Sequence, residues 1–312
     1  MIINIFLYLL SFVFIWFGSG LIVSSIDTFA RKLRISSFAL SFFVLGLFTS
    51  IPEISLGINS IVEKEPEILV GDIIGEVIVI YLLLIPTLAI IGNGIKLNRQ
   101  LNNQNLLLAM LVCLTPAFLI SDRILSLSEG LLLILLYGLL FYFIEKNQGI
   151  LEAVERKFAH PDGREFLYIG KIILGTGIVF LSSRYLVDRT VFFSQILNIS
   201  PFLISLIALS LGTNLPELSV GIRSLYSGKK DIAFGDYVGS AAANTLILGV
   251  LTIFNGSSIV IPNHFFQRFF FMFIGLSLFY FFSRSKNDIS RIEGIGLLYI
   301  YLLFLLVEIV VS

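Results

Sequence analysis

The sequence predicts an all-α polytopic membrane protein of ten transmembrane helices, arranged as two inverted five-helix repeats with broken helices. Three observations predict this fold. The chain of 312 residues is 57% hydrophobic and only 13% charged, whereas soluble domains contain about 25% charged residues. Its apolar segments approach the ~20 residues that a helix needs to cross a bilayer. The second half of the chain also repeats the first at a constant offset of 164 residues.

The apolar segments follow one another with short connections. The first begins at the N-terminus without a basic region or a small-residue cleavage site, so we interpret it as a membrane helix and not as a signal peptide. The predicted segments are 2–26, 37–62, 68–92, 105–121, 125–145, 167–187, 200–225, 231–254, 265–283 and 293–311. The charged stretch 146–166 predicts a solvated cytoplasmic linker. The first repeat then spans 1–145 and the second 167–312.

Lysine and arginine collect in the connections that follow odd-numbered segments. Arg31, Lys32 and Arg34 follow the first segment, while Arg284 and Lys286 follow the ninth. By the positive-inside rule these connections are cytoplasmic. We therefore expect an integral protein of the plasma (inner) membrane with both termini extracytoplasmic. The net charge of +0 gives no basic surface for nucleic acid, and one cysteine excludes an intrachain disulfide.

The internal repeat is clearest within residues 36–85 and 200–249. Thr49, Pro52 and Glu53 coincide with Thr213, Pro216 and Glu217 when the chain is shifted. Further on, 71–75 coincides with 235–239. Because five segments are an odd number, the second repeat enters the membrane from the opposite side. Inverted repeats with a site at their interface are typical of secondary transporters.

The repeated polar residues predict a cation site. A carboxylate at the centre of a bilayer costs ~2.5–3.5 kcal/mol on insertion scales, yet Glu53 and Glu217 both lie in apolar segments. Each follows a threonine by four residues, a spacing that shares one helix face. Pro52 and Pro216 free main-chain carbonyls by removing an N–H group. Hard oxygen ligands of this kind suit Ca²⁺ and Na⁺ and do not suit zinc or copper.

The third and eighth segments supply a second group of residues. Glu76 and Ser240 occupy equivalent positions, as do Ile80 and Asn244 four residues further on. The neighbouring glycines favour close approach of the helices. Asp72 and Asp236, near the segment ends, are expected to cap or pair more than to ligate.

These motifs resemble the α-repeats of the sodium/calcium exchanger family, of the prokaryotic type without a large regulatory loop, within the calcium/cation antiporter superfamily. That pattern is G-T-S-x-P-E followed by G-N-x-x-G-S-x-x-x-N or -D. Residues 212–217 and 235–244 fit the second repeat closely, and 49–53 fit the first. The resemblance implies an antiporter, not an enzyme, that exchanges Ca²⁺ against Na⁺ by alternating access, with the first and sixth segments sliding. It implies inorganic cations as transported ions and no cofactor; we infer no obligate protein partner. Its implied ligands are Thr49, Ser50, Glu53, Glu76, Thr213, Asn214, Glu217, Ser240 and Asn244.

Departures from the family pattern leave alternatives open. Glu76 replaces a usual Ser, Ile80 cannot ligate, and Asn214 replaces a usual Ser. Asn244 stands where many members have Asp, so a carboxylate is lost there and one is gained at Glu76. Glu76 could bind a cation or carry a proton. One alternative is therefore a proton-coupled or other cation exchanger of altered selectivity. The other is a transport-inactive homologue that binds ions.

Overall fold

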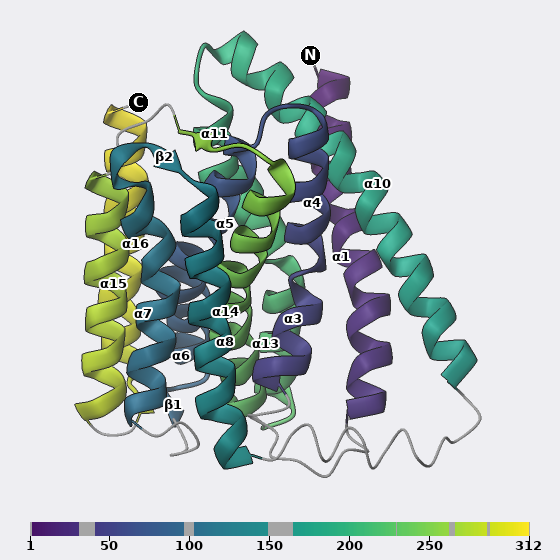
Figure 1. The fold of residues 1–312 in the computed structure, drawn as a ribbon. Coiled ribbons are helices and arrows are strands. Elements are labelled where there is room, and N and C mark those ends of the chain that lie inside the picture. The colour runs from purple at the N-terminus through teal and green to yellow at the C-terminus, as the bar shows by residue number, and fades with distance from the viewer. Residues whose placement is uncertain are drawn as a thin grey trace.

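The structure is a computed structural model that describes residues 2–30, 41–96, 103–148, 165–228, 230–261, 266–285 and 288–311. These residues are almost entirely helical (Figure 1). The continuous long helices are α1 (Ile2–Ala30), α7 (Asn103–Leu119), α8 (Leu127–Gln148), α10 (Glu165–Leu197), α14 (Lys230–Asn255), α15 (Phe266–Ser285) and α16 (Arg291–Val311). A short 3₁₀ turn, η3 (Ile120–Asp122), follows α7.

Three further membrane crossings consist of several helical pieces. The first contains the π-helical η1 (Ser41–Leu45), α3 (Gly46–Thr49) and α4 (Ile51–Val62). The next contains α5 (Glu67–Val79), the π-helical η2 (Ile80–Leu84) and α6 (Ile85–Ile91). The last contains α11 (Pro201–Ile204), the π-helical η4 (Ser205–Leu209), α12 (Ser210–Thr213) and α13 (Leu215–Tyr226). With these, the predicted set of apolar segments is accounted for.

The predicted breaks fall one residue after Thr49 and Thr213, the threonines that the two repeats share. Ser50 interrupts the first crossing with φ −80° and ψ 12°, and Asn214 interrupts its counterpart with φ −75° and ψ 3°. Pro52 and Pro216 lie in the first turns of α4 and α13, where a helix leaves its N–H groups without internal partners. The prolines therefore stand at the start of the helices that follow the breaks, where their missing N–H group costs no hydrogen bond.

Two short strand pairs show the repeat in the backbone. β1 (Ile95–Lys96) pairs with β4 (Asp288–Ile289), and β2 (Ile124–Leu125) pairs with β3 (Ile259–Val260), both antiparallel. A shift of 164 residues converts β1 into β3 and β2 into β4, and it preserves the register of both pairs. The sequence did not predict these strands, because two residues show no alternation.

α1 and α10 lie side by side along one flank of the bundle (Figure 1). They approach closely at Gly18 and Gly175: a Cβ atom on Gly18 would lie 2.9 Å from the carbonyl oxygen of Gly175. Small residues at such crossings allow backbones of membrane helices to touch. α10 continues to Leu197, ten residues beyond its predicted end at 187. Both ends of the chain lie at the same end of the molecule in Figure 1.

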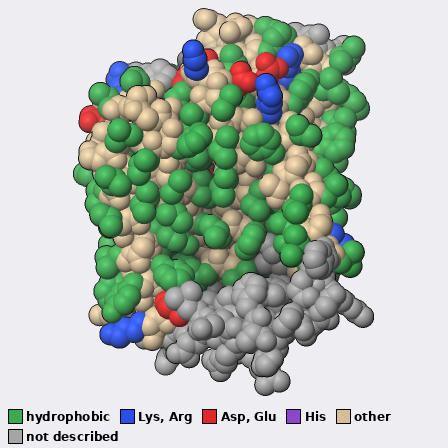
Figure 2. Space-filling model, turned by 45° about the vertical axis from the view of Figure 1, so that its right-hand side comes forward, with side chains coloured by type: hydrophobic (Ala, Val, Ile, Leu, Met, Phe, Trp, Pro, Cys, Tyr) green, Lys and Arg blue, Asp and Glu red, His purple; other side chains and the backbone are tan. Residues whose placement is uncertain are grey.

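The outer surface fits a lipid environment. Within the described residues, eight helical stretches are long and apolar enough to cross a membrane. α15 and α16, with 20 and 21 residues, complete the predicted number of crossings. Figure 2 shows hydrophobic side chains across the middle of one face, with charged side chains toward its ends. Residues 149–164 of the predicted linker lie outside the described part of the chain, and its ends belong to α8 and α10.

Candidate functional site

The predicted site lies where the two broken crossings meet α5 and α14. Glycines make this meeting possible. A Cβ atom on Gly75 would collide with the carbonyl oxygen of Leu206 in η4, and one on Gly239 would collide with that of Phe42 in η1. These contacts are equivalent under the 164-residue shift. The close helix approach expected from the glycines is confirmed, and it places side chains of both repeats within bonding distance.

All of the predicted ligands are buried. The exposed fraction of each is 0%, except for 2% at Asn214. Asp72 and Asp236 are equally buried. Within the described residues, the structure therefore places five carboxylic acids in the centre of the protein, at Glu53, Asp72, Glu76, Glu217 and Asp236.

Ser240 connects the two repeats at the centre of this region. Its hydroxyl lies 3.1 Å from Glu76 Oε1, 3.1 Å from Glu217 Oε1 and 3.2 Å from the Ser50 hydroxyl. Glu76 and Ser240 are equivalent positions of the two repeats, so the pseudo-twofold axis passes between them. A single hydroxyl hydrogen can serve only one acceptor at a time, and the network therefore has spare acceptor oxygens.

Two threonine–aspartate hydrogen bonds also cross the interface. Thr49 donates to Asp236 over 3.3 Å, and Thr213 donates to Asp72 over 3.2 Å. The two bonds are repeat equivalents. Of the two expected roles, capping or pairing, the structure shows pairing, because α5 begins at Glu67 and α14 at Lys230, which leaves both aspartates inside their helices. They pair with the opposite repeat instead.

Many buried oxygens in this region have no hydrogen-bond partner. Both carboxylate oxygens of Glu53 are unpartnered, as is one oxygen on each of the other four acids. Ligand atoms of Glu53, Asp72 and Glu76 lie within 4.8 Å of one another. Burial of a charged oxygen without a partner is expensive, whereas a bound cation would satisfy several of them at once.

The asparagines complete the polar lining. Asn214 donates its amide to the carbonyl oxygen of Ser210, 2.7 Å away, which leaves its Oδ1 unpartnered. Asn244 lies beside Glu76, but neither of its side-chain polar atoms forms a hydrogen bond of ordinary geometry. The equivalent of Asn244 in the first repeat, Ile80, is buried among apolar side chains. The two repeats therefore contribute unequally to the site.

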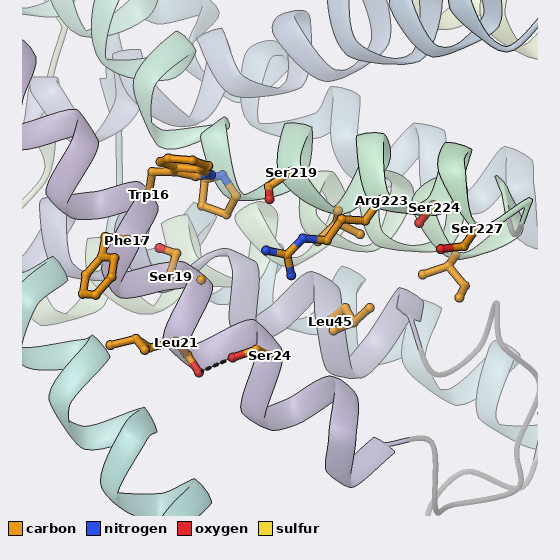
Figure 3. Close-up of a pocket in the computed structure, with 14 residues that line it drawn as sticks. Trp16, Phe17, Ser19, Leu21, Ser24, Leu45, Ser219, Arg223, Ser224 and Ser227 are labelled. Atoms are coloured by element: carbon orange, nitrogen blue, oxygen red, sulfur yellow. Dashed lines mark hydrogen bonds between the residues drawn. The ribbon is translucent and has the colours of Figure 1, made fainter.

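A cavity of about 400 Å³ lies beside this region, between α1, the η1 residue Leu45 and α13. It is lined at one end by Pro216, which precedes Glu217, and at the other by Ser227 and Ile232. Figure 3 shows that Arg223 projects into it from α13 and that Ser19 faces it from α1. We call the end of the molecule where α13 leads into α14 the basic side, because the sequence concentrates lysine and arginine there.

Comparison with known proteins finds relatives that align with most of this chain. The chain is 26% identical to the sodium/calcium exchanger MaX1 of Methanosarcina acetivorans, over 98% of both chains. It is 27% identical to the inner membrane protein YrbG of Escherichia coli, over 74% of this chain and 75% of that protein. Structures of the sodium-calcium exchanger NCX_Mj, including one soaked with Na⁺ and Sr²⁺, share the fold with a TM-score of 0.69, 24% identity and 97% coverage of both chains.

The family comparison covers both repeats. The model described as "Sodium/calcium exchanger protein" matches residues 3–145 and 167–310. These ranges include the buried acids, both helix breaks and both strand pairs. The chain belongs to the sodium/calcium exchanger protein family.

Proposed function

We propose that this chain is a secondary active antiporter that exchanges Ca²⁺ against Na⁺ by alternating access, with its cation sites among the buried acids at the repeat interface. The observation that carries the proposal is the set of buried carboxylate oxygens without partners. Ca²⁺ takes six to eight oxygen ligands, including carboxylates and carbonyls. The described residues offer such oxygens from both repeats, and Pro216, which precedes Glu217, lines the neighbouring cavity.

The residues have separable roles in this proposal. Glu53 and Glu217 follow the helix breaks and bind the divalent ion, with Thr49 and Thr213 beside them. Ser50, Glu76, Asn214, Ser240 and Asn244 line the flanking sodium positions. Asp72 and Asp236, which the sequence did not suggest as ligands, hold the threonines in place and add negative charge.

A second candidate is proton coupling through the same site. Five ionised acids carry five negative charges, and one Ca²⁺ balances two of them. Like charges in one buried site cannot all ionise without cations or protons. We assign this proton exchange to Glu76, the acid that stands where the family pattern usually has Ser; like Glu217, it accepts a hydrogen bond from Ser240.

Flux measurements in proteoliposomes test both candidates. Vesicles loaded with Na⁺ and diluted into Na⁺-free medium are expected to accumulate ⁴⁵Ca²⁺, and collapse of the Na⁺ gradient is expected to stop the uptake. Uptake driven by a pH gradient in the absence of Na⁺ would identify the proton-coupled exchanger. If no gradient of either ion moves any tested cation, the antiporter proposal fails.

Variants connect the flux to the site. Glu53→Gln keeps the size of the side chain but removes its charge, and we expect it to abolish uptake. Glu65→Gln makes the same change in the connection between α4 and α5, outside the cluster, and is the matched control. Equal uptake by the two variants would exclude Glu53 as a ligand of the transported ion.

A further inference from the structure

Two apolar clusters show that α1 and α10 are equivalent elements of the two repeats. One cluster contains Ile15, Leu56, Leu186 and Leu209, together with four further buried residues. The other consists of Val179, Val220, Ile22 and Leu45. Each of these four members of the first cluster corresponds to one of the second by the 164-residue shift. The contact of α10 with α4 on one side of the molecule is therefore the counterpart of the contact of α1 with α13 on the basic side.

On the side opposite the basic side, this contact is closed by hydrogen bonds. The side-chain amide of Asn59 on α4 donates to the hydroxyl of Ser183 on α10 over 2.8 Å, and lies 3.2 Å from the carbonyl oxygen of Phe180. Arg184 of α10 also lies 3.8 Å from Glu63, at the end of α4. We call the bonds of Asn59 to Ser183 and Phe180 the closing contact.

On the basic side the equivalent residues are apart. The shift places Arg223 at the position of Asn59, Ser19 at that of Ser183, and Trp16 at that of Phe180. All three line the cavity between α1 and α13. The hydroxyl oxygen of Ser19 is buried and has no hydrogen-bond partner, although its counterpart Ser183 accepts from Asn59. Figure 3 shows the Arg223 guanidinium between α13 and the α1 residues.

We propose that Arg223 is the residue that closes the basic side. When α1 moves onto α13, the guanidinium donates to the Ser19 hydroxyl and to the main-chain carbonyl of Trp16, as Asn59 does on the opposite side. A guanidinium carries five N–H donors in a fixed plane on a long stem, so it can reach both acceptors. The bond forms in the state in which the closing contact at Asn59 is broken.

The ion pair of the opposite side has no counterpart here. Gly20 and Ser227 stand at the positions of Arg184 and Glu63, and both line the cavity. Of the side-chain donors that close the opposite side, Asn59 therefore has a donor counterpart here, Arg223, and Arg184 has none. This inference rests on the proposed alternating access. Its test measures the accessibility of cysteines and not transport, so failure of the Arg223 proposal can be told from failure of the antiporter proposal.

The test compares two equivalent reporters. Ser219 lines the basic-side cavity, and its counterpart Ser55 is buried on the opposite side. In a Cys113→Ala background, Ser219→Cys and Ser55→Cys are labelled separately with the neutral thiol reagent N-ethylmaleimide in purified full-length protein. Each labelling rate is divided by the rate of the same variant in unfolded protein. The ratio of the Ser219→Cys rate to the Ser55→Cys rate then reports how much of the protein is open on the basic side relative to the opposite side.

Arg223→Ala removes both proposed bonds and is expected to raise this ratio about three- to fifteenfold, the range that hydrogen bonds between membrane helices support. Arg223→Gln keeps a side-chain amide donor without the charge, and is expected to stay within about twofold of the parent protein by the same measure. An unchanged or lowered ratio in Arg223→Ala overturns the proposal. A ratio in Arg223→Gln equal to that of Arg223→Ala overturns the hydrogen-bonding role. Thermal unfolding of both variants in parallel identifies a loss of fold.

Discussion

Replacement of Asn59 by alanine tests the closing contact on the side opposite the cavity. An amide nitrogen has two hydrogens. One is directed to the carbonyl oxygen of Ser55 within α4 and the other to Ser183 on α10, both over 2.8 Å. Asn59→Ala therefore removes one strong hydrogen bond between helices and the longer approach to Phe180. Ser183 keeps its own bond to the Phe180 carbonyl oxygen, so no donor is stranded.

The size of the effect follows from these contacts. Hydrogen bonds between membrane helices contribute about 0.6 kcal/mol on average and about 1.7 kcal/mol at most. Because ~1.4 kcal/mol corresponds to a tenfold change in an equilibrium constant, the closed state loses roughly three- to fifteenfold in population relative to its alternative. The pair of Arg184 and Glu63 does not compensate, since its side chains are 65% and 40% exposed and surface pairs contribute little.

The assay is the same ratio of cysteine labelling rates as for Arg223→Ala, but here the ratio is expected to fall. Asn59→Ala is expected to accelerate labelling of Ser55→Cys relative to Ser219→Cys, because it favours the state in which α10 leaves α4. Asn255→Ala makes the same substitution in a position where the amide bonds only to Ser257, and is the control. A ratio unchanged from the parent protein, or an equal shift in the control, would refute the reasoning.

Three further substitutions probe the site and the bundle. Ser240→Ala is expected to weaken Ca²⁺ binding about tenfold in titration calorimetry, because residues that orient ligands typically contribute this much; unchanged affinity would argue against its role. Gly239→Ala should lower the melting temperature, since the new Cβ meets the Phe42 carbonyl oxygen and overpacking costs ~1–3 kcal/mol; a melting temperature equal to that of the parent would contradict it. Glu308→Ala removes the carboxylate 2.9 Å from the buried Arg268 guanidinium and should cost at most ~3–5 kcal/mol in chemical unfolding, because Arg268 keeps its contact with the Phe202 ring; partial recovery is expected when Arg268→Met is added.

The sequence predicted the elements of the site well because the repeat doubled every signal. Thr49 with Glu53, and Thr213 with Glu217, were conspicuous only as a pair of motifs in apolar segments. The structure buries all of them and places the helix breaks beside them, at Ser50 and Asn214. The site assignment itself stays a proposal until ion binding is measured.

The sequence predicted contacts across the interface poorly. Asp72 and Asp236 were expected to cap or pair, but local sequence does not reveal a partner 141 or 187 positions away, as in the bonds to Thr213 and Thr49. The end of α10 was placed too early for a related reason. The apolar segment was ended at 187, directly before Asp188 and Arg189, but these two residues pair with each other within α10, which continues to Leu197.

The close crossing of α1 and α10 at Gly18 and Gly175 has a consequence for energy coupling. Two helices that touch through their backbones cannot separate without losing that contact, so they shift together against the bundle. A displacement that brings α1 onto α13 then moves α10 away from α4 at the same time. Neither helix adjoins a strand pair, whereas β1 with β4 joins the ends of α6, α15 and α16, and β2 with β3 joins those of α8 and α14. Simultaneous opening of both sides, which would let ions run down their gradients unexchanged, would require this glycine contact to come apart first.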